Sequence, residues 1–164
     1  MNVGALFGLS VLMSFLAFSI VSKLYILPRL RVMQREEAIA PLVVPHTFRF
    51  VGLSFLVPGV VSPSLSSAFA VPAAYGDLVA AIMAGIATLA LSARAVWAIA
   101  MVWAFNLWGT VDLLHAIYQG QIGVRVDAGS FGAAFFIPTL VVPGLLTMHA
   151  LIFWLLLRPR KPAP

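Results

Sequence analysis

The sequence predicts an all-α integral membrane protein, a single transmembrane domain over residues 1–164. The chain is 62% hydrophobic and only 9% charged, whereas a soluble domain is about half apolar and a quarter charged. Its apolar residues gather in five stretches, each close to the roughly 20 residues that cross a bilayer as a helix. The Lys and Arg residues lie mainly in alternate gaps between those stretches. A small domain in water could not bury this much apolar surface, so the solvent of the chain is lipid.

The basic residues predict the orientation of the bundle. Nine of the ten Lys and Arg residues fall on one side of a five-helix arrangement, and Arg125 falls elsewhere. Cytoplasmic loops carry this excess, so we expect the N-terminus outside and the C-terminus in the cytoplasm of a bacterial inner (plasma) membrane. The same cations suit anionic lipid headgroups at that face, and no nucleic-acid motif is present. The nine are Lys23, Arg29, Arg31, Arg35, Arg49, Arg94, Arg158, Arg160 and Lys161.

The predicted transmembrane helices span about residues 3–27, 42–61, 77–93, 95–118 and 131–157. A four-helix arrangement is the alternative, in which the short third stretch merges with a neighbour. That alternative would place Arg94 in lipid or break the charge alternation, so five helices rank first.

Small residues and prolines give individual helices a predicted role. Gly4 and Gly8 lie one turn apart in the first helix, a spacing that permits close helix packing or dimerisation. The prolines of the second and fifth helices free backbone carbonyls and predict kinks near mid-membrane. Together with Asn106 they favour a central cavity walled by the second, fourth and fifth helices. The kinking prolines are Pro58, Pro138 and Pro143.

Ionisable residues within a membrane are costly and therefore mark candidate sites. Asp112 and His115 lie three residues apart on the fourth helix, so their side chains can touch. The pair suits a general base or proton relay, and it equally suits simple neutralisation of a buried charge. Asp77, expected as the N-cap of the third helix, joins them in a predicted outer cluster. Tyr75 and Arg125 complete this cluster, Trp108 shares the Asp112 stripe, and Thr110 lies with Asn106 on a second stripe.

A second predicted set lies in the inner half of the membrane. His46 and Arg49 begin the second helix, and His149 lies in the inner half of the fifth, so the two histidines could face each other at similar depth. Two neutral imidazoles could ligate a b-type haem. The simpler interpretation has His149 bonded to a backbone carbonyl and Arg49 as a cation that snorkels to the headgroups.

These observations leave three functional hypotheses. The first is a membrane protein that binds or passes a small, lipophilic molecule through an intramembrane cavity. The second is a membrane-embedded isomerase or hydratase that acts on a lipophilic substrate through Asp112 and His115 or through haem b. The third is an accessory subunit of a homo-oligomer or larger membrane complex. The absence of cysteine excludes disulfides, thiolate metal sites and Cys nucleophiles.

Overall fold

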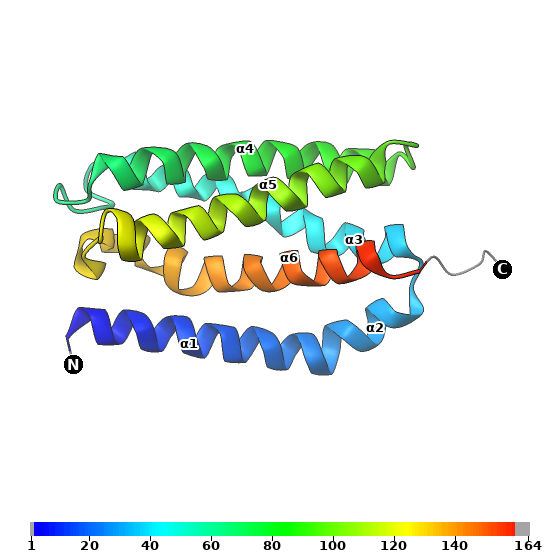
Figure 1. The fold of residues 1–164 in the computed structure, drawn as a ribbon, viewed down its shortest axis with the longest axis horizontal. Coiled ribbons are helices and arrows are strands. Elements are labelled where there is room, and N and C mark those ends of the chain that lie inside the picture. Colours follow the sequence, from blue (N-terminus) through cyan, green and yellow to red (C-terminus); the bar gives the residue numbers. More distant parts are fainter. Residues whose placement is uncertain (1, 160–164) are drawn as a thin grey trace.

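The protein is a bundle of antiparallel helical rods in the computed structural model, which describes residues 2–159 (Figure 1). Successive rods run in opposite directions, so the two labelled ends of the chain lie at opposite ends of the bundle. We call these the N-terminal end and the C-terminal end of the bundle. The elements in chain order are α1 (Val3–Val21), η1 (Ser22–Ile26), α2 (Leu27–Val32), α3 (Arg35–Val43), η2 (Val44–Leu56), α4 (Ser67–Ser92), α5 (Ala98–Tyr118), η3 (Gln119–Gly123), η4 (Ala128–Phe135), η5 (Ile137–Val141) and α6 (Val142–Leu157).

Four rods are long and apolar enough to cross a membrane, which makes this a helical membrane protein. They cover Val3–Val32, Arg35–Leu56, Ser67–Ser92 and Ile137–Leu157. The remaining rod, α5, is the fourth in chain order, and its centre and second half carry four polar residues that lower its hydropathy: Asn106, Thr110, Asp112 and His115. It nevertheless packs along both α4 and α6 within the bundle.

The second rod begins and ends earlier than the predicted range of residues 42–61. It starts at Arg35, where Glu36 and Glu37 occupy the first turn and interact favourably with the helix dipole. Pro41 lies inside α3, and the chain then tightens into a 3-10 helix from Val44 to Leu56. Pro58 follows the end of the rod, in a turn with Gly59 at φ 85°. The predicted kink at Pro58 is therefore wrong: this proline lies beyond the helix.

The third rod is longer than predicted, because its N-cap is Ser66 rather than Asp77. The Ser66 side chain accepts a hydrogen bond from the backbone N–H of Ala68 at 3.3 Å, which satisfies a free donor of the first turn. Most of residues 62–76, which separate the second and third predicted helices, thus belong to α4, with Pro72 inside the helix. Asp77 consequently lies well inside α4 and not at its end.

The first and last rods also differ from their predicted bounds. The first continues through a π-helical turn to Val32, so the hydrophilic gap shrinks to two residues before α3. The last is interrupted at Gly132, whose φ of 52° breaks η4. Pro138 and Pro143 lie near the start of the rod that η5 and α6 form, so its irregular backbone is near the N-terminal end of the bundle.

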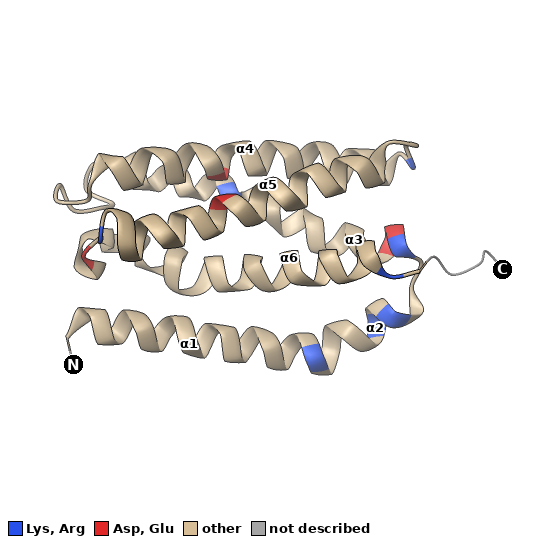
Figure 2. Cartoon of the chain, viewed as in Figure 1, with Lys and Arg blue, Asp and Glu red and all other residues tan. Residues whose placement is uncertain are grey.

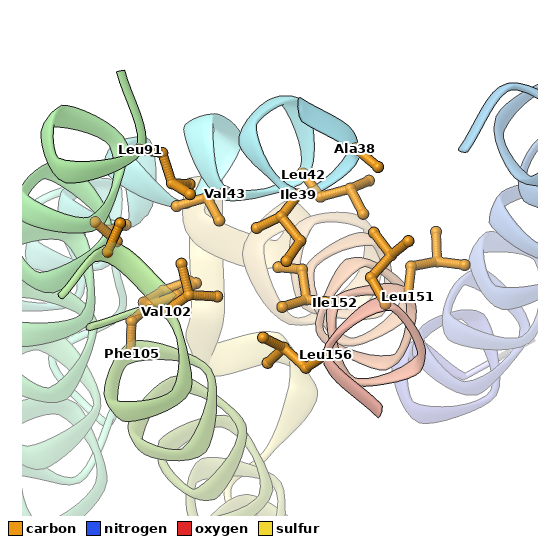
Figure 3. Close-up of a cluster of buried hydrophobic side chains, with 14 of the residues drawn as sticks. Ala38, Ile39, Leu42, Val43, Leu91, Val102, Phe105, Leu151, Ile152 and Leu156 are labelled. Carbon is orange, nitrogen blue, oxygen red and sulfur yellow. The ribbon is translucent and has the colours of Figure 1, made fainter. Parts of the chain in front are cut away.

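Two apolar clusters hold the rods together. The larger one occupies the C-terminal end, where α3, α4, α5 and α6 meet (Figure 3). Ile39, Val102 and Ile152 are fully buried there. The smaller cluster, towards the N-terminal end, is aromatic: Phe55, Phe69 and Phe131 pack with ring centroids 5.6–6.0 Å apart. Helix α1 is peripheral, with Ser14 its one buried residue.

Charged residues occur mainly at the C-terminal end of the bundle, as the predicted asymmetry requires (Figure 2). Arg125 and Asp127 lie in the loop at the opposite end. One basic residue departs from the prediction. Arg49 is 1% exposed and lies inside the bundle beside two acidic residues, so it is not a cation at the headgroup level. Arg160 and Lys161 lie outside the described residues.

Candidate functional site

A buried ionic triad lies near the middle of the bundle. Arg49 of η2 donates from Nε to Asp77 Oδ1 of α4 at 2.7 Å, and from Nη2 to Asp112 Oδ2 of α5 at 2.6 Å. The two carboxylate side chains are 10% and 12% exposed. Arg49 Nη1 also donates to the Gly109 carbonyl oxygen at 3.2 Å. A single guanidinium thus ties three rods together, which satisfies a buried cation that would otherwise be very costly.

Three glycines, one on each of these rods, allow the backbone to approach the triad. A Cβ atom on Gly52 would collide with the Asp77 side chain, and one on Gly76 would collide with the Asp112 carboxylate. At Gly109 it would lie 2.8 Å from Arg49 Nη1 and 2.7 Å from His149 Cε1. Small residues let membrane helices pack closely, and here they do so directly against charged side chains.

A neutral polar network continues from the triad towards the C-terminal end. His149 Nε2 lies 3.5 Å from Arg49 Nη1, and His149 Nδ1 lies 2.6 Å from Asn106 Oδ1. Asn106 also donates from Nδ2 to the His149 carbonyl oxygen at 3.3 Å. The His46 and His149 rings lie with their centroids 4.2 Å apart, so the two histidines face each other as the sequence predicts. Both nitrogens of His46 lack a hydrogen-bond partner among the described residues.

The two histidines do not fit a haem. Their rings are in direct contact and at most 1% exposed, and Phe105 packs against both at 5.0 and 5.3 Å. A haem iron bound by two imidazoles lies between the rings together with its macrocycle, and rings whose centroids are 4.2 Å apart leave no room for it. Neither histidine lines the cavity described below. Within residues 2–159, no group of three or more His, Cys, Asp or Glu side chains could hold a metal ion.

A cavity of about 410 Å³ lies on the other side of the triad, towards the N-terminal end. Its walls come from α1, from the first half of α4, from the second half of α5 and from the start of the last rod. Asp77 and Asp112 both line it, whereas Arg49 does not. Phe7, Phe69 and Phe131 are among its aromatic lining residues. The size falls within the usual range for small-molecule sites, roughly 300–1,000 Å³.

This cavity differs from the predicted one in its walls and depth. Helix α1 forms one whole side, and the spaced glycines Gly4 and Gly8 line it. Asn106 is not among its lining residues, because its side chain faces His149 instead. Of the second rod, Phe55 is the residue that reaches it. The cavity therefore lies nearer the N-terminal end of the bundle than the predicted centre at Asn106, and the second half of α5 lines it.

The predicted outer cluster is only partly assembled. Asp77 and Asp112 do come together, through Arg49 rather than Arg125. His115 is exposed, and its ring nitrogen Nε2 pairs with Gln119 Nε2 at 3.3 Å. Tyr75 is 54% exposed. The Trp108 indole donates to the Gly76 carbonyl oxygen at 3.5 Å, and the Thr110 hydroxyl donates to the Asn106 carbonyl oxygen at 2.7 Å, a bond within its own helix.

Sequence reasoning missed the glycines and the phenylalanines of this site. Gly76 precedes Asp77, and this adjacency of a small and a charged residue was the available signal for close approach. The phenylalanines come from four separate rods, and no local pattern joins them. The protein is thus a helical membrane protein with a buried Arg–Asp–Asp triad at one end of an aromatic-lined cavity.

Comparison with known sequences places the chain in a family. The family model described as Domain of unknown function (DUF8737) matches residues 6–157, so the chain belongs to this family. No curated protein and no solved structure matches the chain.

Proposed function

We propose that this protein binds or passes a small lipophilic molecule in the cavity between α1 and the rest of the bundle. The observation that carries the proposal is the cavity itself, which is about 410 Å³ and lined mostly by apolar residues, with Asp77, Asp112 and Gln121 as its polar lining residues. Sites for small molecules combine this kind of apolar lining with a few convergent polar groups. Because α1 packs mainly on η4, η5 and α6, its seam with α5 offers a route from the membrane interior.

We further propose five spans, with the N-terminus outside and the C-terminus in the cytoplasm of a bacterial inner membrane. Helix α5 connects the ends of two qualifying rods and lies between them, which favours a fifth crossing (Figure 1). The basic residues at the C-terminal end then contact anionic headgroups. A C-terminal alkaline phosphatase fusion should be inactive and a C-terminal green fluorescent protein fusion bright. The opposite result would refute this orientation.

Binding is favoured over general-base catalysis by the partners of the candidate residues. Asp112 is engaged by Arg49 and His115 by Gln119, so the predicted acid–base pair is not formed. Assembly into a homo-oligomer or a larger membrane complex is compatible with a binding role. The native mass of the protein, purified in a mild detergent, tests that assembly.

Photolabelling tests occupancy of the cavity directly. A neutral aliphatic diazirine should label cavity residues of α1 and α5 in the purified protein, as mapped by peptide mass spectrometry. Gly8→Trp should abolish that labelling, because Gly8 lines the cavity and a Cβ there meets nothing within 4 Å. Gly85→Trp is the matched control, since a Cβ on Gly85 also meets open space but outside the cavity lining. Equal labelling of both variants would refute the binding proposal.

A further inference from the structure

We propose that the cavity selects a lipophilic cation, an apolar molecule that carries a protonated amine or quaternary ammonium group, with that group against Asp77 and Asp112. This inference rests on the proposed binding function and names its ligand class. It follows from the charge of the triad, from the side of the triad that faces the cavity and from the residues of the cavity wall.

The triad joins one guanidinium to two carboxylates, which formally leaves one negative charge unbalanced. An unbalanced charge inside a membrane protein is costly, so the site favours a partner of opposite sign. The nearest imidazoles do not offer one from the cavity side. His149 lies next to Arg49, His115 is exposed and contacts Gln119, and none of the three histidines lines the cavity. A positive group can therefore reach Asp77 and Asp112 from the cavity.

The triad presents its negative members to the cavity. Asp77 and Asp112 line the space, while Arg49 is 1% exposed and lies behind them. A ligand in the cavity thus meets carboxylates and not the guanidinium. An anionic or phosphate-bearing ligand would face like charge at this floor, which suppresses binding. The proposed ligand is therefore an ammonium ion without a phosphate group, and not a phospholipid headgroup, whose phosphate would enter the site with its ammonium group.

The aromatic wall suits the same ligand. Phe55, Phe69 and Phe131 pack as a mutual cluster, and Phe7 of α1 stacks on Phe131 with ring centroids 5.9 Å apart. All four line the cavity. Aromatic faces attract ammonium groups through the ring quadrupole, and proteins bind quaternary ammonium groups against aromatic side chains. Two carboxylates and an aromatic wall in the same cavity together describe a site for an alkylammonium ion.

Equilibrium binding of radiolabelled octyltrimethylammonium to the full chain in maltoside micelles tests the inference. We expect saturable binding that the neutral carbon isostere 2,2-dimethyldecane displaces at least about tenfold less well than unlabelled octyltrimethylammonium. Phosphatidylethanolamine should not displace the probe. Displacement by that lipid at equal concentration would identify a headgroup as the ligand and overturn the inference of an ammonium ion without a phosphate group.

Substitutions in the cavity lining test whether the carboxylate charge and the aromatic wall determine affinity for the ammonium probe. Asp112→Asn keeps an acceptor for Arg49 and removes the unbalanced charge, so affinity for the ammonium probe should fall at least about tenfold. Asp127→Asn makes the same change at an exposed loop residue and should leave affinity unchanged. Phe7→Leu provides a second variant on the peripheral helix and should weaken the ammonium probe more than the isostere. Circular dichroism and elution volume verify folding of each variant.

The outcomes distinguish this inference from the binding proposal on which it rests. If the diazirine labels the cavity but the isostere competes as well as the ammonium ion, the cavity binds neutral molecules and the cation inference is wrong. The inference is equally wrong if Asp112→Asn and Phe7→Leu, both folded, retain wild-type affinity. If neither probe responds to Gly8→Trp, both proposals fail.

Discussion

Arg49→Met removes the cation of the triad and leaves two carboxylates buried without it. Arg49 is 1% exposed and makes ion pairs of 2.7 and 2.6 Å to Asp77 and Asp112. At an effective dielectric constant of about 20, unit charges 4 Å apart interact by about 4 kcal/mol. Loss of one partner from a buried pair costs about 3–5 kcal/mol, which also includes the desolvation of the charge left behind. We therefore expect the free energy of unfolding to fall by about 3–5 kcal/mol.

The expected loss corresponds to a change of between about a hundredfold and a few thousandfold in the unfolding equilibrium constant. Titration with sodium dodecyl sulfate in mixed micelles, followed by circular dichroism, measures it. The triple variant Arg49→Met/Asp77→Asn/Asp112→Asn removes every charge of the triad and should recover most of the stability, because replacing a buried ion pair by neutral groups is often close to neutral. Arg29→Met, at an exposed residue of α2, controls for loss of a surface cation.

Two results would refute the reasoning. If Arg49→Met lies within about 1 kcal/mol of the wild type, the triad does not hold the three rods together. If the triple variant is as unstable as the single one, the loss comes from the shape of the arginine side chain and not from unpaired carboxylates. With the Asp77→Asn/Asp112→Asn variant measured as well, the departure of the triple variant from the sum of the two separate changes gives the coupling energy of the charges.

Two further predictions concern the packing around the triad. Gly109→Ala should lower the free energy of unfolding by about 1–3 kcal/mol, because the new methyl group lies 2.7 Å from a His149 ring carbon. Gly85→Ala is the control and should leave the free energy of unfolding unchanged, because its Cβ meets open space. Equal effects of the two variants in the same titration would contradict the contact between Gly109 and His149. His46→Leu should raise the free energy of unfolding by about 1 kcal/mol because it removes an imidazole without hydrogen-bond partners. Asn106→Leu should lower the free energy of unfolding by about 1–3 kcal/mol because it leaves His149 Nδ1 without its hydrogen-bond partner. The reverse order of these two variants would show that His46 has a partner of its own.

The members of the site were largely predictable from the sequence, because ionisable side chains in an apolar helix are expensive and therefore stand out. Arg49, Asp77, Asp112, His46 and His149 were all singled out on that ground. Their grouping was only partly predictable. The facing histidines were expected and are found at 4.2 Å. Arg49 was expected with the histidines and the two aspartates with His115, whereas Arg49 in fact joins both sets.

The wrong grouping has a local cause, the placement of two helix ends. The third rod begins at the Ser66 cap and the second at Arg35. These shifts move Asp77 away from a helix end and place Arg49 in the middle of its rod. Caps and first turns contribute only about 1 kcal/mol each to helix stability. The serines and prolines of residues 62–76 are typical of a loop, so the sequence gives only a weak indication that a helix begins at Ser66. At 1.5 Å per residue, an error of one to three turns in a helix boundary changes the expected depth of a residue in the membrane by about 5–16 Å.

The sequence by itself determined the solvent of this protein, its all-helical class and the uneven placement of its basic residues, because each follows from composition and from the cost of charge in lipid. Only the tertiary structure decided which charges pair, which glycines admit them and where the rods leave a cavity. Those properties depend on contacts between residues far apart in the chain, such as Arg49 with Asp112 and Phe7 with Phe131. Lipid offers helices little hydrophobic drive to associate, so close packing and polar contacts set their arrangement. Such contacts require the side chains of neighbouring rods to fit one another, and no single helix encodes that fit.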